Sequence, residues 1–421
     1  MERHSWRFCL GLLSSAVGLM AQSANPQQAL SWQETQAKFR ANNPALLAGE
    51  VTIDESRADE ITAYLRPNPN LNLGLDQLAP FRTSPYRPFS QSYTYGSVDY
   101  LHEREHKREL RLLSAQKGTA VAISTQADLE RNLMFNLRDA FVRVLLAKAV
   151  FAVAKANLDY YDKEIAINRD RFNAGDIARV DFLRVEIQRV QFESDLQTAL
   201  VDLRTAKIDL LALLRDTTPV DQFDVQEAFD FHEPASNLPE LRTLALETRP
   251  DLKGAEQSLD KSRTDHQLSV ANGSTDPTFG VDVSHQPFPL GTYAGVSVSI
   301  PLRIFDRNQG DKLHTLLDIN RNQKLRDQSE ITALHDVDSA YATLQSTVAL
   351  LRPYKTKYLK EAEEIRETVS YAYQRGAATL LDFLDAQKEY RDTQLNYVNL
   401  VGAYYSAANQ VNFSVGREVI R

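Results

Sequence analysis

The chain alternates between two hydrophobic periods. Over long stretches apolar residues recur at helical spacing, as they do at Leu129, Leu133, Leu137, Phe141, Val144 and Leu145. Between these stretches lie short segments with the period of a strand. In the clearest of them, Val296 and Val298 point to one side while Ser297 and Ser299 point to the other. The pattern predicts a mainly α protein with a small β part.

The two periods predict the same series of elements twice. We expect helices of about 35 residues, strands of about ten residues, and very long helical runs that each turn back into a returning helix. The expected ranges are helices near 31–66 and 238–273, strands near 71–78, 92–101, 278–285 and 293–302, long runs near 104–172 and 310–374, and returning helices that end near 214 and 413. Each long run would extend on the order of 100 Å. Pro353 lies inside the second run, where we expect a kink or a break.

Two sequence matches show that the series is an internal repeat. PALLAGEVTIDESRAD (44–59) resembles PDLKGAEQSLDKSRTD (250–265), and GDIARVDFL (175–183) resembles GAATLLDFL (376–384). The matches occur in the same order at nearly one offset, so we divide the mature chain into repeats at 24–237 and 238–421. The second match lies where each long run turns back. It predicts two hairpin tips, near 172–183 and 373–385, with Gly175 and Gly376 in the left-handed conformation that ends a helix.

The N-terminus has the pattern of a secretory signal. Arg3 and Arg7 precede an uncharged apolar run, 8–20, and small residues follow from Ala21 to Ala24. We therefore expect a signal peptide at 1–23, cleaved between about 21 and 24. Cys9 is the only cysteine, and the residues before it are not those of a lipoprotein cleavage site. The mature protein should have no disulfide and no lipid anchor.

Composition narrows the class of protein further. The net charge of −8 argues against a nucleic-acid partner, and no apolar run reaches the ~18–20 residues of a spanning helix. Strands of about ten residues are long enough to cross a membrane, but four are too few to close a barrel. Two chains would supply eight strands and a filled interior, and three would supply twelve and a lumen. A small soluble sheet that joins two coiled-coil arms is the alternative.

Three stretches resemble the TolC-type outer-membrane efflux channel family. YQRGAATLLDFLDAQ (373–387) is similar to that family's second hairpin tip, FNAGDIARVDFL (172–183) to its first, and IPLRIFDRNQG (300–310) to its strand-to-helix exit. The likeness covers residues from about 31 to 416. The Arg-Asn-Gln-Gly that ends the 300–310 stretch is more similar to the heavy-metal branch of the family. The resemblance implies a homotrimer with a twelve-stranded barrel in outer-membrane lipid and a twelve-helix periplasmic tunnel. It also implies a passive exit duct that works with a periplasmic adaptor and an inner-membrane efflux pump, without a cofactor.

The resemblance also assigns roles to residues at the tips. It places Asp382, Asp385, Asp181 and Tyr373 at the periplasmic aperture, where carboxylate rings would select cations. Adaptor docking would involve Gly175, Gly376, Ala174 and Arg375. One position departs from the family pattern, because Ala378 stands where a basic gate residue is expected. Arg179, Arg184 and Arg375 are the cations nearest in sequence. Without the resemblance, the aspartates are carboxylates at helix starts, where the helix dipole favours them.

Two other readings are open on the sequence. HEREH (102–106) matches the zinc-peptidase pattern H-E-x-x-H, with Glu103 as a candidate base. Its charged surroundings and the lack of an evident third ligand argue for a hydrophilic helix start instead. An exported structural or adhesive coiled-coil protein would also have long helices, but it would not need paired strands and a duplicated tip. We therefore expect no enzyme and no resident metal.

Overall fold

The computed structural model describes residues 29–78, 80–81, 85, 88–89, 91–235 and 237–420. The expected signal peptide at 1–23 lies outside these residues. The described helices and strands are α1 (Trp32–Asn42), α2 (Pro44–Tyr64), β1 (Asn70–Asp76), β2 (Tyr93–Leu101), α3 (Lys107–Ala174), α4 (Arg179–Leu214), a 3-10 turn (Val220–Gln222), α5 (Leu238–Thr248), α6 (Pro250–Asn272), β3 (Thr278–Gln286), β4 (Gly291–Ser299), α7 (Gln309–Pro353), a π turn (Tyr354–Tyr358), α8 (Leu359–Gln374) and α9 (Leu380–Val415).

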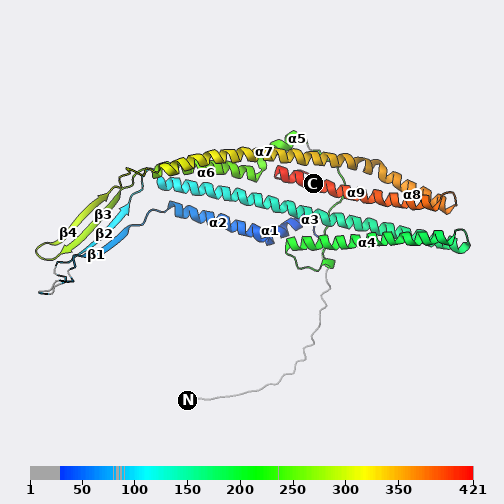
Figure 1. Cartoon of the computed structure of the whole chain (residues 1–421), viewed down its shortest axis with the longest axis horizontal. Coiled ribbons are helices and arrows are strands. Elements are labelled where there is room, and N and C mark those ends of the chain that lie inside the picture. The colour runs from blue at the N-terminus through cyan, green and yellow to red at the C-terminus, as the bar shows by residue number, and fades with distance from the viewer. Residues whose placement is uncertain are drawn as a thin grey trace, which may run out of the picture.

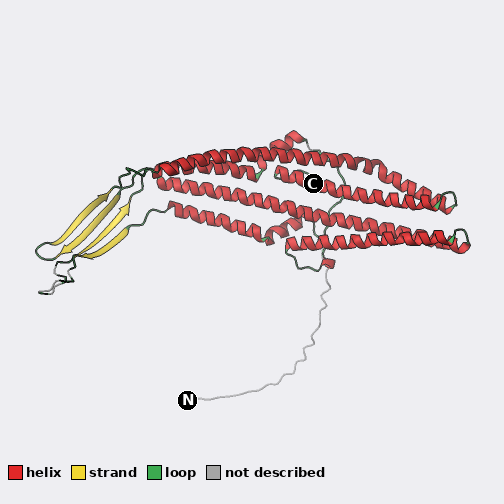
Figure 2. Ribbon diagram, viewed as in Figure 1, coloured by secondary structure: helices red, strands yellow, loops and turns green. Residues whose placement is uncertain are grey.

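The molecule is elongated, with the strands at one end and two helical hairpin tips at the other (Figures 1 and 2). Each repeat contributes two strands and one hairpin, α3–α4 in the first repeat and α7–α8–α9 in the second. The expected fold, mainly helical with two strands and a long hairpin per repeat, is confirmed. No helix among the described residues has both the length and the apolar character to cross a membrane.

The four strands form one antiparallel sheet in the order β1-β2-β3-β4. Cross-strand partners such as Leu71 with Val98 and Val281 with Val296 place the apolar residues on one face. The opposite face carries Asn, Ser and Tyr together with Asp76, Asp99 and Asp282. None of the four described strands contains a lysine or an arginine. The sheet therefore has one exposed apolar face and one polar, acidic face.

The last strand differs slightly from its predicted range. We expected it near 293–302, whereas β4 spans Gly291–Ser299. Pro301 follows, and proline lacks the N–H that a further ladder hydrogen bond would need.

The helices form an elongated layer that continues from the sheet. Next to the sheet the helices lie side by side in the order α2-α3-α6-α7. Toward the tips the order of neighbouring helices is α4-α3-α9-α8. The first-repeat helices α2 and α4 therefore lie along one edge of the layer, and α7 and α8 lie along the other (Figure 1).

Each predicted 35-residue helix is in fact two helices. Asn43 separates α1 from α2, and its side chain caps α2 by accepting hydrogen bonds from the N–H groups of Ala45 and Leu46. Arg249 separates α5 from α6 at the equivalent place. Both following helices begin with a proline, Pro44 and Pro250. Proline is suited to the first turn of a helix but disfavours helical backbone in the residue before it. The prediction of unbroken helices was wrong for this reason.

The break expected at Pro353 is present. Pro353 is the last residue of α7, and a π-helical turn, Tyr354–Tyr358, connects it to α8. Proline removes one hydrogen bond of the α-helical ladder, and a π turn absorbs the resulting change of register.

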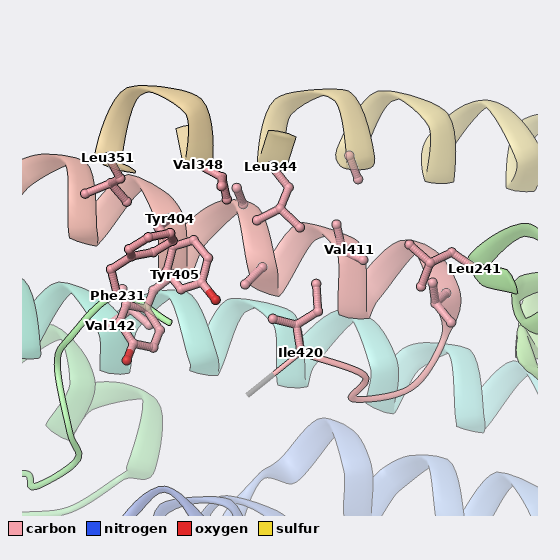
Figure 3. Close-up of a cluster of buried hydrophobic side chains, with 14 of the residues drawn as sticks. Val142, Phe231, Leu241, Leu344, Val348, Leu351, Tyr404, Tyr405, Val411 and Ile420 are labelled. Atoms are coloured by element: carbon pink, nitrogen blue, oxygen red, sulfur yellow. The ribbon is translucent and has the colours of Figure 1, made fainter. Parts of the chain in front are cut away.

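Three hydrophobic clusters hold the described helices together. One joins α1, α2, α3 and α4, with Phe141 and Leu210 fully buried. A second joins α3, α5, α7 and α9 around Tyr404 and Leu344 (Figure 3). The third lies near the tips and packs the first hairpin on the second. The predicted stripe on α3 is confirmed from Leu137 onward, where its apolar members are buried.

Candidate functional site: the hairpin tips

Both tips use the same backbone geometry. Gly175 has φ 85° and Gly376 has φ 76°, in the left-handed region that favours glycine. The Gly175 N–H donates to the Phe172 carbonyl at 3.0 Å, and the Gly376 N–H donates to the Tyr373 carbonyl at 3.0 Å. In each tip the next N–H donates to the carbonyl one residue further back, from Asp176 to Arg171 and from Ala377 to Ala372. These bonds satisfy the last carbonyls of each helix.

The repeated Asp-Phe-Leu has a structural explanation at both tips. Its aspartate is the third residue of the returning helix, Asp181 in α4 and Asp382 in α9. Its phenylalanine is buried and stacks on the aromatic ring of the previous helix's last turn. Phe182 stacks on Phe172 with ring centroids 5.4 Å apart, and Phe383 stacks on Tyr373 at 4.8 Å. The motif therefore closes each hairpin by packing as well as by hydrogen bonding.

The two equivalent aspartates have different surroundings. Asp382 forms a capping box with Thr379, whose N–H and hydroxyl donate to Oδ2 at 3.0 and 2.7 Å. These hydrogen bonds lower the pKa of Asp382. The equivalent cap position in α4 is Ala178, which has no side-chain oxygen to offer. Asp181 is half-buried between the hairpins instead.

Asp385 lies one turn further along α9 and is exposed. It lines a shallow groove between α8 and α9 together with Glu361, Glu389 and Asp392. This groove is acidic apart from Lys388.

Tyr373 is buried between the two hairpins and is only 5% exposed. The guanidinium of Arg171 lies over its ring, 4.8 Å from the centroid. Burial raises the pKa of Tyr373, the charge of Arg171 partly offsets that effect, and the negative charge of Asp181 adds to it. The structure thus brings Tyr373, Asp181 and Arg171 together, while Asp382 and Asp385 lie on the exposed side of α9.

Sequence reasoning missed Arg171. It noted Arg179, Arg184 and Arg375 only as the cations nearest in sequence to the tips, and all three are exposed. Arg375 lies over Tyr371 of its own helix at 5.3 Å. Ala378 packs against the tip cluster. The available signal was the helical spacing of Arg171, four residues before Gly175, which places it in the last turn of α3.

The proposed docking residues form the outer surface of the tips. Ala174, Gly175, Arg375 and Gly376 are all exposed. An added Cβ at either glycine would meet no atom within 4 Å. Their conformation, rather than lack of space, is what requires glycine.

The zinc-peptidase reading of HEREH fails on geometry. His102 follows β2, and α3 begins only at Lys107, so the two histidines do not share a helix face. The candidate base Glu103 is paired with Arg111, and Lys107 forms an ion pair with Asp276 at 2.6 Å. In the part of the chain that the structure describes, no three His, Cys, Asp or Glu residues are grouped to hold a metal.

The chain is similar to an outer membrane efflux family, to a metal resistance protein and to membrane proteins of known structure. The sequence model of the family described as outer membrane efflux protein matches residues 241–417. The chain is 24% identical, over 377 residues, to the cobalt-zinc-cadmium resistance protein CzcC of Cupriavidus metallidurans, covering 89% of this chain and 87% of that one. Its fold is similar to that of CusC, with a TM-score of 0.76 and 17% identity over 91% and 92% of the two chains. It is also similar to the outer membrane protein VceC of Vibrio cholerae, with a TM-score of 0.72 and 17% identity over 92% and 96%.

The fold and these comparisons make the chain similar to outer membrane efflux channels, with the family match confined to residues 241–417. CusC and VceC, whose fold this chain resembles, are described as a protein that forms a transmembrane channel and as an outer membrane protein. Channels of this family are transport proteins and not enzymes.

Proposed function

We propose that three copies of this chain form the exit duct of a tripartite efflux system that carries metal cations. The observation that carries the proposal is the pair of open edges on each protomer. In the described residues β1 and β4 each pair with one strand only, and α2 and α4 on one side face away from α7 and α8 on the other. Complementary edges on opposite sides of one subunit produce a ring when the rotation between copies closes.

Both edges of the helical layer expose apolar side chains that an adjacent copy would cover. On α4, Val180, Leu183, Ile187 and Val190 recur at spacings of three and four residues and are 42–71% exposed. On α7, Leu313, Leu317, Leu325 and Ile331 are more than half exposed. The α4 stripe fits the helix-to-helix contacts of a coiled coil, and the exposed leucines of α7 offer apolar surface on the opposite edge.

The two faces of the sheet support closure into a barrel. The apolar face suits lipid, and the polar face suits a water-filled lumen. An open strand edge is not tolerated in lipid, so four strands require partner chains. Three copies supply twelve strands, enough for a lumen.

We assign the tips two roles within this duct. Asp181, Asp382, Asp385 and Tyr373 form the periplasmic aperture, where Tyr373 is buried behind the surface and Arg171 supplies the cation that the family pattern expects at the position of Ala378. The exposed corners with Gly175 and Gly376, flanked by Ala174 and Arg375, dock a periplasmic adaptor coupled to an inner-membrane pump. The shared backbone of the two corners supports this assignment, because one kind of partner surface could bind both.

The choice of cargo rests on two observations. The similar protein CzcC is described as a cobalt-zinc-cadmium resistance protein. The polar face of the sheet has carboxylates from Asp76, Asp99 and Asp282, and the four strands contain no lysine or arginine. A lumen lined in this way attracts cations.

Deletion of the gene tests the cargo. We expect the mutant to become sensitive to cobalt, zinc or cadmium salts, and the cloned gene to restore resistance. Sensitivity to hydrophobic drugs alone, with unchanged metal tolerance, would overturn the metal assignment and leave the channel class intact.

A further inference from the structure

A buried arginine connects the two hairpins about two turns above the second tip. Arg366, on α8, is 8% exposed. Its guanidinium carbon lies 4.1 Å from the ring centroid of Tyr160 on α3 and 3.8 Å from that of Tyr390 on α9. Since α8 packs mainly against α9, this long side chain is a direct link from α8 to the first hairpin.

Hydrogen bonding of this guanidinium is incomplete. Its Nε is buried without a hydrogen-bond partner among the described residues. The nearest carboxylates, Glu363 and Glu367, lie at 3.9 and 3.8 Å, beyond hydrogen-bond distance, and both are more than half exposed. Contact with the two aromatic rings is therefore its main stabilising interaction.

Polar contacts surround the arginine on all three helices. Tyr160 Oη donates to Ser370 Oγ at 3.4 Å, and Gln387 Nε2 donates to the same oxygen at 2.9 Å. Gln394 Nε2 donates to Tyr390 Oη at 2.6 Å. These polar contacts lie beside the apolar cluster, which includes Leu158 and Tyr161 of α3.

We propose that Arg366 is a positioning residue of the efflux tunnel, which holds the second hairpin against the first through Tyr160 and so sets the position of the tip that bears Tyr373 and Asp385. The proposal rests on the proposed function, because it takes the tips as the aperture. Arg366 and Tyr373 are seven residues apart on one helix, about 10 Å along its axis. A displacement of α8 at Arg366 is therefore transmitted directly to the aperture.

The same features make the contact reversible. When α8 leaves α3, water hydrates the guanidinium and supplies the hydrogen bonds that it lacks in the packed state. An apolar contact of equal size would form no hydrogen bonds with water when the two helices separate. The contact of Arg366 with Tyr160 and Tyr390, which we call the clamp, can therefore hold the two hairpins together and still separate at a moderate cost in free energy.

Planar-bilayer recording of the purified full-length protein tests the clamp. We expect Arg366→Ala to raise the fraction of time in the high-conductance state about tenfold, which corresponds to about 1.4 kcal/mol. Tyr160→Leu should do the same, because it removes one ring. Tyr160→Phe keeps the ring, loses only the long 3.4 Å hydrogen bond to Ser370, and should behave nearly like wild type. Arg366→Lys retains the charge without the planar face and should restore only part of the wild-type behaviour.

The double variant and a matched control sharpen the test. Arg366→Ala with Tyr160→Leu should add little to either single change, because both remove the same contact. Arg108→Ala removes a similar cation–π contact, 4.5 Å from Tyr64, near the sheet, and should leave the currents unchanged. Wild-type currents in both Arg366→Ala and Tyr160→Leu, with or without a lower melting temperature, would show that Arg366 only packs. A wild-type protein that forms no conducting pore would instead contradict the proposed function.

Discussion

Arg249 should be one of the most sensitive positions for stability. It lies at the break between α5 and α6, with its side chain 3% exposed. The guanidinium donates to both Asp251 oxygens at 3.0 and 2.6 Å, to Asp336 Oδ2 at 2.9 Å, and to the Ser414 carbonyl at 3.2 Å. It therefore joins α6, α7 and the end of α9 at one point. The perturbation that we choose is Arg249→Met, which keeps most of the volume and removes the charge.

The expected loss of unfolding free energy follows from the carboxylates of Asp251 and Asp336, which remain without their arginine. Removing one partner of a fully buried ion pair costs about 3–5 kcal/mol, because the remaining charge is buried alone. Here Asp251 and Asp336 keep 29% and 32% of their side-chain surface in water, and Arg131 remains 3.5 Å from Asp251. Solvent and this second arginine screen the stranded carboxylates, so we expect a loss of about 2 kcal/mol.

The pH dependence has a definite sign. Burial alone would raise the pKa of Asp251, but the hydrogen bonds and charge of Arg249, with the charge of Arg131, outweigh it and lower that pKa. A carboxyl group with a lowered pKa in the folded state stabilises the fold above its unfolded pKa of about 3.9 and loses that contribution as pH falls further. The difference between wild type and Arg249→Met should thus be full at pH 7 and shrink below about pH 4.

The assay is thermal and urea unfolding of the purified protein in detergent, followed by circular dichroism at several pH values. Arg242→Met is the matched control, because Arg242 binds Asp338 with the same two-point geometry, both at 2.7 Å, but on the surface. This control should leave the melting temperature unchanged. Equal losses in the two variants, or a loss from Arg249→Met that does not depend on pH, would refute the reasoning.

Three further predictions concern assembly and the tips. The mature protein should run as a heat-resistant trimer in an outer-membrane fraction, and a monodisperse monomer in detergent with its full β signal would contradict this. Gly175→Val and Gly376→Val should weaken adaptor docking and lower metal resistance with normal membrane insertion, because β-branched residues resist the left-handed backbone; unchanged export in both variants would count against the docking role. Asp385→Asn should lower cation preference in planar bilayers with an unchanged melting temperature, while Asp382→Asn should also destabilise the tip, since it weakens the capping box with Thr379; identical ion selectivity in both variants and in wild type would leave the carboxylates as helix-start charges only.

Local sequence was sufficient for most of the fold. The strands, the glycine corners and the break at Pro353 depend on period, turn residues and proline, which act over a few neighbouring residues. The interruptions at Asn43 and Arg249 were also readable, since Pro44 and Pro250 mark the start of the next helix, but the apolar pattern across them favoured one helix.

The contacts between hairpins could not be predicted in this way. Arg171 over Tyr373 and Arg366 between Tyr160 and Tyr390 depend on which helix faces meet, and helical spacing within one segment does not specify the partner segment. The same limit applies to Asp181 and Asp382. Their equivalent positions in the repeat suggested equal roles, but Ala178 and Thr379 at the preceding cap give the two carboxylates different surroundings.

The proline at 353 has a consequence for symmetry. A duplicated unit, copied three times around an axis, could form a ring of six nearly equal arms. In the first arm α3 runs for 68 residues without interruption, whereas in the second arm Pro353 and its π turn divide the corresponding run into α7 and α8. In the proposed trimer this interruption would make the two arms of each copy unequal, so the grooves between arms at the tips would alternate between two shapes. A partner protein that approaches the ring would meet three grooves of each kind, and one duplicated gene would offer two distinct docking surfaces.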